Sequence, residues 1–153
     1  MPSLELKVIP PFQVIILGFA SWWLHGHTDF GHVHFGFEYV LSRVLLLLAL
    51  AIAAGSIYQF WRHQTTVNPT RLSQTNSLIT GGLFALSRNP IYVADALVLV
   101  AWSIYLGFWP ALVTVPVFVA YVTRFQIIPE ERVLAEKFGD AYSEYCERVR
   151  RWI

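Results

Sequence analysis

Residues 39–61 read YVLSRVLLLLALAIAAGSIYQFW, an apolar run that decides the fold class. A helix rises about 1.5 Å per residue, so this run spans about 35 Å and can cross a hydrocarbon core about 30 Å thick. Of the 153 residues, 56% are hydrophobic and 14% are charged, whereas soluble domains carry about 25% charged residues. We therefore predict an integral membrane protein, and the length fits a single domain, residues 1–153.

Two further regions are apolar enough to lie in a membrane. Residues 8–24 form one of them, and residues 91–128 form a second that is too long for one crossing. Because the sequence GFWP at 107–110 interrupts the second region, we expect two short helices joined as a tight hairpin. The prediction is an all-α membrane protein with about four transmembrane helices.

After Pro129 the pattern changes to apolar residues at helical spacing. These residues are Leu134, Phe138, Tyr142, Tyr145, Val149 and Trp152. Polar residues fill the positions between them, which predicts a C-terminal amphipathic helix at the membrane surface.

The distribution of positive charge predicts the orientation. Under this topology only Arg43 lies toward the outer side. The other basic residues lie on one side: Lys7, Arg62, Arg71, Arg88, Arg124, Arg132, Lys137, Arg148, Arg150 and Arg151. We therefore expect both termini and the 62–90 loop in the cytoplasm. The N-terminal residues lack a basic region and a cleavage site, so we expect no cleaved signal peptide.

Charge and cysteine content exclude several classes of function. The formal net charge of +1 is too small for a nucleic-acid binder, which needs a basic surplus. The lone cysteine, Cys146, excludes an internal disulfide framework and a multi-cysteine metal site.

The 62–90 loop is the longest polar stretch, and a loop of this length in a small protein is usually functional. It ends at Asn89-Pro90, which suit the N-cap and the first position of a helix. The start of that helix would attract anions, with Arg88 beside it, and Gly81-Gly82 would let backbone approach a ligand. The structural alternative is a capped helix whose arginine reaches lipid phosphates.

Pro129, Glu130 and Glu131 predict a second helix start, where carboxylates interact favourably with the helix dipole. A solvated helix start explains these residues equally simply. However, the two helices of a hairpin must have their ends close together. We therefore expect Glu130 and Glu131 to face Arg88 and Asn89 at one face of the membrane.

Two linked motifs resemble a known family. GGLFALSRNPIYV at 81–93, followed by EERVLAEKFGDAYSEYCERV at 130–149, is similar to the isoprenylcysteine carboxyl methyltransferase and phospholipid methyltransferase superfamily, and TTVNP at 65–69 resembles its bacterial members. The resemblance covers about residues 65–151. It implies S-adenosylmethionine as methyl donor, bound at the cytoplasmic face by a core at 62–153, a lipophilic acceptor from the bilayer, and a bacterial inner-membrane location.

The resemblance also implies cofactor contacts, residue by residue. They are Asn76, Ser77, Leu78, Ile79, Phe84, Asn89, Pro90, Ile91, Tyr92 and Glu130. To these the chemistry of the residues adds Gly82, Glu131, Tyr142 and Tyr145, because glycine allows close approach and tyrosine rings can stack on the adenine or the sulfonium. The chain departs from the family where Asn89 replaces a histidine and Phe84 a tyrosine.

The predicted catalytic residues are Arg88, Asp95 and Arg124. Gln126 stands where the family has a substrate-contacting arginine, and Arg124 lies two residues away. Asp95 lies about one turn inside the third helix, and an intramembrane carboxylate indicates function. It could be the general base for an amine or hydroxyl acceptor, or it could form a structural ion pair with Arg88. The acceptor remains open among an isoprenylated cysteine carboxylate, a phospholipid amine, a quinol and a small isoprenoid acid.

The sequence HGHTDFGHVHFG at 25–36 supports a rival hypothesis. Its histidines, His25, His27, His32 and His34, could bind zinc or copper in a membrane protein without enzymatic activity. No recognised metal motif is present, so we expect a solvated loop and no metal site. A third possibility, a small structural subunit, leaves the 62–90 loop and the Glu130-Glu131 pair unexplained. The oligomeric state stays open.

Overall fold

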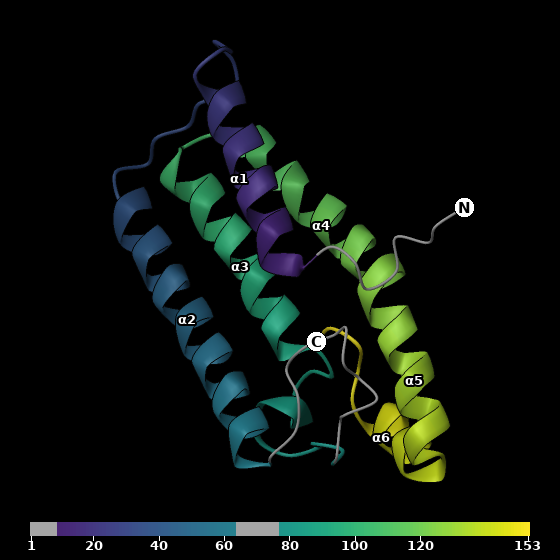
Figure 1. Ribbon diagram of the computed structural model, residues 1–153. Coiled ribbons are helices and arrows are strands. Elements are labelled where there is room, and N and C mark those ends of the chain that lie inside the picture. Colours follow the sequence, from purple (N-terminus) through teal and green to yellow (C-terminus); the bar gives the residue numbers. More distant parts are fainter. Residues whose placement is uncertain (1–8, 64–76) are drawn as a thin grey trace, which may run out of the picture.

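The computed structural model describes residues 9–63 and 77–153, and within these ranges the chain forms helices and turns without a β-strand (Figure 1). The prediction of an all-α protein is therefore confirmed for the described residues. The elements are α1 (Pro10–His25), α2 (Glu38–Arg62), the short 3₁₀ helix η2 (Gly82–Ala85), α3 (Pro90–Tyr105), the 3₁₀ helix η3 (Trp109–Val113), α4 (Thr114–Val122), the π-helical turn η4 (Thr123–Ile127), α5 (Ile128–Phe138) and α6 (Asp140–Arg148).

Helix α3 lies at the centre and contacts α1, α2 and α4 (Figure 1). The buried polar and small residues of α2, Ser42, Ala49 and Ser56, are spaced by seven and form one stripe. Small residues in such a stripe let two helix backbones approach closely, as is common in membranes. Because the small residues face the other helices, the bulky apolar residues of α2 lie on the outer surface of the bundle.

Two helices are long and apolar enough to cross a membrane. They are α2 and the continuous helix Trp109–Phe138, whereas α3 is apolar but only 16 residues long. Only 17% of the most apolar window of α2 is buried. Such a large apolar surface is typical of contact with lipid rather than water. The count of four spanning helices stays a prediction.

The predicted helix start at Pro129 is wrong. The chain is helical through Val122, the π turn η4 and Ile128, so α4 and α5 form one continuous helix. Proline has no N–H and its ring collides with the preceding turn of an α-helix. A wider π turn directly before Pro129 accommodates it without breaking the helix. Glu130 and Glu131 therefore lie inside a helix and not at a free N-terminus.

The single C-terminal helix predicted from the apolar spacing is also wrong. Gly139 has φ +50° and separates α5 from α6, and α6 ends at Arg148. Val149 is extended, and the segment 149–153, called here the C-terminal tail, runs back toward the start of α3 (Figure 1). The indole of Trp152 donates a hydrogen bond to Thr123 Oγ1 at 3.2 Å. The apolar residues therefore keep helical spacing beyond Arg148, although the helix ends there.

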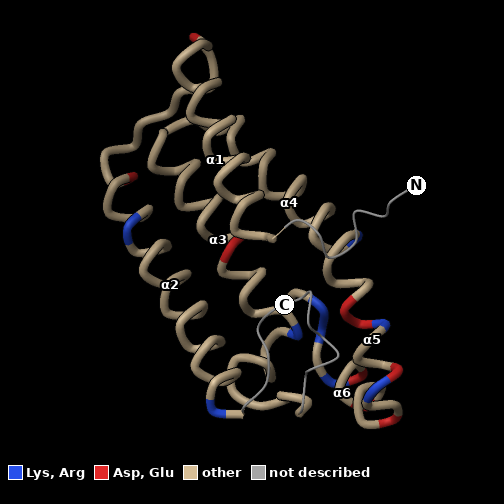
Figure 2. Tube along the Cα trace, viewed as in Figure 1, with Lys and Arg blue, Asp and Glu red and all other residues tan. Residues whose placement is uncertain are grey.

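The described basic residues gather at the end of the bundle where α2 ends and α3 begins, while Arg43 lies near the start of α2 (Figure 2). The predicted orientation rests on this uneven distribution of basic residues between the two ends of the bundle. Lys7 and Arg71 lie outside the described residues.

Gly107 makes the turn between α3 and η3, and we predict that it tolerates no side chain. Its φ is +59°, and a Cβ atom would lie 2.9 Å from the Val33 carbonyl oxygen. The matched control is Gly36, whose φ is +84° but where a Cβ would meet no atom within 4 Å. Both alanine variants should lose about 1 kcal/mol to backbone strain. Gly107→Ala should lose clearly more, measured as a lower melting temperature in detergent; equal losses would contradict this account.

Candidate functional site

A cavity of about 240 Å³ lies where α3 begins. Its wall is built from the start of α1, the end of α2, the segment before η2, the first turns of α3, and α5 and α6. The predicted site residues that line it are Ser77, Leu78, Ile79, Phe84, Arg88, Asn89, Pro90, Ile91, Tyr92, Asp95, Glu130, Glu131, Tyr142 and Tyr145. Three segments that are far apart in the sequence therefore meet at one cavity.

Three predicted site residues are not among those lining the cavity. Asn76 lies outside the described residues. Gly82 packs against the side-chain amide of Gln59, which a Cβ atom at this position would overlap. Arg124 has its guanidinium 5.4 Å from the centre of the Phe125 ring. Gln126, which stands at the family's arginine position, is fully buried.

The cavity also has lining residues that were not predicted: Ile9, Pro10, Pro11, Phe60 and Leu134. Most precede the recognised motifs and carry no motif of their own. The predicted topology could have indicated the residues of α1 and α2, because it puts the start of the first helix and the end of the second at the same face as the 62–90 loop.

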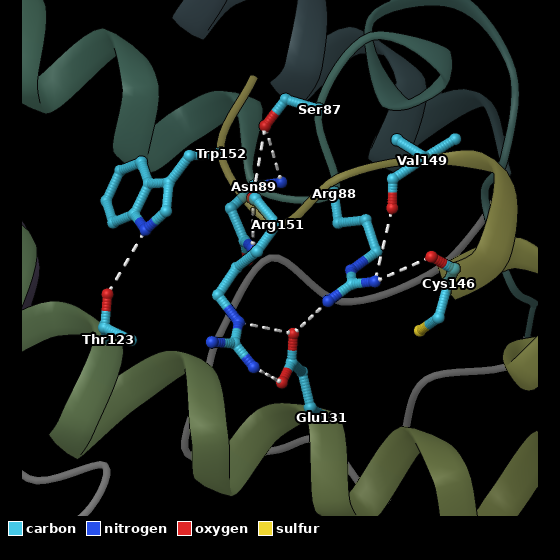
Figure 3. Close-up of polar contacts among 9 residues, drawn as sticks. All are labelled: Ser87, Arg88, Asn89, Thr123, Glu131, Cys146, Val149, Arg151 and Trp152. Carbon is cyan, nitrogen blue, oxygen red and sulfur yellow. Dashed lines mark hydrogen bonds and ion pairs between the residues drawn. The ribbon is translucent and has the colours of Figure 1, made fainter.

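The carboxylate of Glu131 binds two arginines (Figure 3). Arg88 Nη2 donates to Oε1 at 2.7 Å, and Arg151 donates Nε to Oε1 at 3.0 Å and Nη2 to Oε2 at 2.7 Å. The other terminal nitrogen of Arg88 donates to the carbonyls of Cys146 and Val149, each at 3.2 Å. Arg88 thus joins α3, α5 and the end of α6, and the ion pair with Asp95 considered from the sequence is not formed.

Asn89 is the N-cap residue and Pro90 begins α3, as predicted. However, the Asn89 side chain does not cap the helix; its Nδ2 donates to the carbonyl of Arg151 at 2.9 Å (Figure 3). The first turn of α3 therefore has no side-chain acceptor for its N–H groups. Ile91 and Tyr92 belong to this turn and line the cavity, so unpaired donors lie at its wall.

Two further carboxylates, besides Glu131, lie in the cavity wall. Glu130 Oε1 accepts a hydrogen bond from the Tyr92 hydroxyl at 2.6 Å, which confirms that the Glu pair faces the start of α3. Asp95 follows Tyr92 by about one turn on α3, and its Oδ2 is buried without a hydrogen bond from any described residue. The wall thus offers one carboxylate held by a phenol and one with an open acceptor.

Aromatic side chains form the opposite part of the wall. Tyr145 donates its hydroxyl to the Phe84 carbonyl at 2.7 Å, which fixes α6 against η2. Burial raises the pKa of Tyr145, and burial together with the nearby Glu131 carboxylate raises the pKa of Tyr142. Both phenols are therefore neutral at physiological pH. The ring of Phe84 also packs edge-on against Phe60 at 5.3 Å between centroids.

The histidines of the 25–36 loop point to different partners. The His25 and His32 rings meet at 4.7 Å, His27 stacks on Trp23, and His34 Nδ1 lies 3.3 Å from Glu38 Oε1. Among residues 9–63 and 77–153, no three His, Cys, Asp or Glu side chains are grouped so that they could hold a metal ion. The rival hypothesis of a metal-binding loop thus has no assembled donor set in this part of the chain.

Comparison with known proteins gives a family and two relatives. The family model described as phospholipid methyltransferase matches residues 37–141, from the residue before α2 into α6. An uncharacterised protein of Haemophilus influenzae is 41% identical over 63 residues, which cover 41% of this chain and all of that protein. The Delta(14)-sterol reductase of Mus musculus is 25% identical over an alignment covering 97% of this chain and 46% of the reductase, so the chain spans less than half of its length. No solved structure matches.

We predict that Glu131→Gln destabilises the protein by about 2 kcal/mol, because Arg88 and Arg151 lose their counter-charge. This is below the roughly 3–5 kcal/mol of a fully buried pair, since the Arg151 side chain is 38% exposed. The C-terminal tail should also become accessible to carboxypeptidase. The matched control is Glu136→Gln on the exposed face of α5, which should change neither the melting temperature nor digestion. Similar behaviour of the two variants would contradict the role assigned to Glu131.

Proposed function

The chain belongs to the phospholipid methyltransferase family, and we propose that it transfers a methyl group from S-adenosylmethionine to a lipophilic acceptor at the cavity where α3 begins. The observation that carries this proposal is the composition of the cavity wall. Unpaired N–H groups, three carboxylates and a set of aromatic rings converge there from separate segments.

The residues of the wall fit the cofactor part by part. The first-turn N–H groups at Ile91 and Tyr92 suit its carboxylate, as a helix start suits an anion. Glu130 is a partner for its ammonium or its ribose hydroxyls, and the open acceptor of Asp95 suits a positive charge. The rings of Phe84 and Tyr142 can stack on adenine or contact a sulfonium.

The role of the protein is mainly alignment and exclusion of water. S-adenosylmethionine, when bound, supplies an electrophilic methyl group. Arg88 and Glu131 hold the start of α3 against α5 and α6, so the donors of α3 and the rings of α6 keep fixed positions. The C-terminal tail lies across the same junction through Arg151 and Asn89 and helps to close it.

Asp95 is proposed as the group that accepts the acceptor's proton. An amine or a hydroxyl must lose a proton when it is methylated, whereas a carboxylate does not. The charge of Arg88, a residue of the cavity wall, is already matched by Glu131, and its terminal nitrogens also donate to two carbonyls. The wall thus favours an acceptor that carries an amine or a hydroxyl over one that carries a carboxylate.

We further propose that the protein spans the bacterial inner membrane with this cavity at the cytoplasmic face. The gathering of basic residues at the end of the bundle where α2 ends and α3 begins supports that side, because cytoplasmic segments carry an excess of Lys and Arg (Figure 2). The acceptor would arrive from the bilayer between the start of α1 and the end of α2, where Pro10, Pro11 and Phe60 line the cavity.

We predict that Glu130→Ala weakens S-adenosylmethionine binding by about 1–3 kcal/mol, the cost of leaving polar partners unsatisfied in a buried site. Titration calorimetry of the protein in detergent measures this directly. Glu136→Ala is the matched control and should bind with the wild-type affinity. If a folded Glu130→Ala protein binds the cofactor as well as the wild type does, the site is misassigned.

We predict that Asp95→Asn lowers methyl transfer to an amine acceptor by roughly 10²–10⁴-fold, the usual contribution of a general base, and spares transfer to a carboxylic acid. Methyl-labelled S-adenosylmethionine, total membrane lipid and defined acceptors of each class supply the assay. Cofactor affinity is measured in the same variant. Equal, small effects on both acceptor classes would place Asp95 outside the reaction, and loss of cofactor binding would make it a binding residue instead.

A further inference from the structure

A second groove of about 390 Å³ lies between α1, α2 and α3, toward the opposite end of the bundle from the proposed methyl-transfer cavity. Gly18 of α1 and Ser42 of α2 are small residues in its wall. A Cβ atom at Gly18 would already lie 3.8 Å from the Trp102 ring. The Trp102 indole also donates a hydrogen bond to the Gly18 carbonyl at 3.0 Å, so a side chain larger than a methyl group at Gly18 would extend into the groove beside Trp102.

The one cation of this groove, Arg43, lies in an apolar part of α2. Val40 and Leu47, three residues before and four after it on the same helix face, are 64% and 66% exposed. Arg43 forms no ion pair or hydrogen bond with the described residues, and Glu38, the acidic residue at the start of α2, is paired with His34. An arginine without a partner among apolar residues of a membrane helix is costly, so it requires an anion or contact with head groups.

An aromatic wall stands beside Arg43 along the groove. The rings of Trp102 and Tyr105 stack with centroids 5.5 Å apart, and Tyr105 meets Tyr39 of α2 at 5.7 Å. Trp and Tyr are enriched at the level of lipid head groups. Arg43 follows the start of α2 by five residues, or about 7.5 Å of helix rise. The groove thus combines apolar residues with a cation near the start of an apolar helix, beside aromatic residues of the kind found at the head-group level.

We propose that this groove binds an anionic phospholipid of the leaflet at that end of the bundle. The guanidinium of Arg43 would hold the phosphate, for which its planar donors are well suited, and one acyl chain would lie over Gly18 and Ser42 against Trp102. Charge distinguishes this groove from the methyl-transfer cavity, whose wall carries the carboxylates of Glu130 and Asp95. The unpaired Arg43 therefore favours an anionic lipid in this groove, whereas Arg88 in the cavity is already paired with Glu131.

Native mass spectrometry of the full-length protein in detergent tests the proposal. The protein is titrated with phosphatidylglycerol or with phosphatidylcholine of the same acyl chains, without S-adenosylmethionine. The first phosphatidylglycerol should bind about fivefold tighter than the first phosphatidylcholine, the effect of one arginine on a lipid with a net negative charge, since choline balances the phosphate of phosphatidylcholine. Arg43→Gln should reduce this ratio to about one. Arg62→Gln, which removes an exposed cation at the other end of the same helix, should retain it.

A second variant tests the groove independently of its charge. Gly18→Leu fills the groove and keeps Arg43, so it should weaken the first binding event for both lipids at least several-fold. The proposal is overturned if Arg62→Gln removes the lipid preference as fully as Arg43→Gln does. It is also overturned if Gly18→Leu and Arg43→Gln both bind lipid like the wild type. A change from dimer to monomer in Gly18→Leu with unchanged lipid binding would instead assign the groove to contact between two copies of the chain.

Discussion

The interaction on which the candidate site depends is the carboxylate of Glu131 held between Arg88 and Arg151. It connects α5 to the start of α3 and to the C-terminal tail, and Arg88 extends the connection to the carbonyls at the end of α6. Each of these segments contributes residues to the cavity wall or closes it. Without this charge pairing, two arginines would lie close together, and α3, α5 and α6 would lose their common anchor.

The neighbouring residue shows how one helix serves both structure and chemistry. Glu130 and Glu131 are adjacent and point in different directions, so one meets the Tyr92 hydroxyl and the other meets the arginines. The π turn at Thr123–Ile127 allows the helix to pass Pro129 unbroken. The two carboxylates are therefore carried on a long, continuous helix rather than on a frayed helix start. A rigid support of this kind suits a site that works by alignment.

One face of helix α3 lines both the methyl-transfer cavity and the second groove. Ile91 and Asp95 line the cavity, and Val98, Trp102 and Tyr105 line the second groove. These positions follow helical spacing of three or four residues, so the two sites are stacked along the bundle. Their charged groups differ, because the cavity carries Arg88, Asp95, Glu130 and Glu131, whereas the charged residue of the second groove is Arg43. Under the two proposals, the cavity would take a positively charged or proton-donating group and the second groove an anionic lipid.

The sequence alone determined the all-α class, the apolar helices and most of the residues that line the cavity, because apolar runs, turn residues and the two linked motifs are local patterns. It also indicated that the Glu pair faces the start of α3, since the ends of a hairpin must meet. Only the tertiary structure decided which partner each polar group takes. Arg88 pairs with Glu131 rather than Asp95, and Asn89 bonds the tail instead of capping its helix. These hydrogen-bond partners depend on the path of the C-terminal tail. The apolar spacing predicted a helix past Arg148, but the helix ends there and the chain turns back.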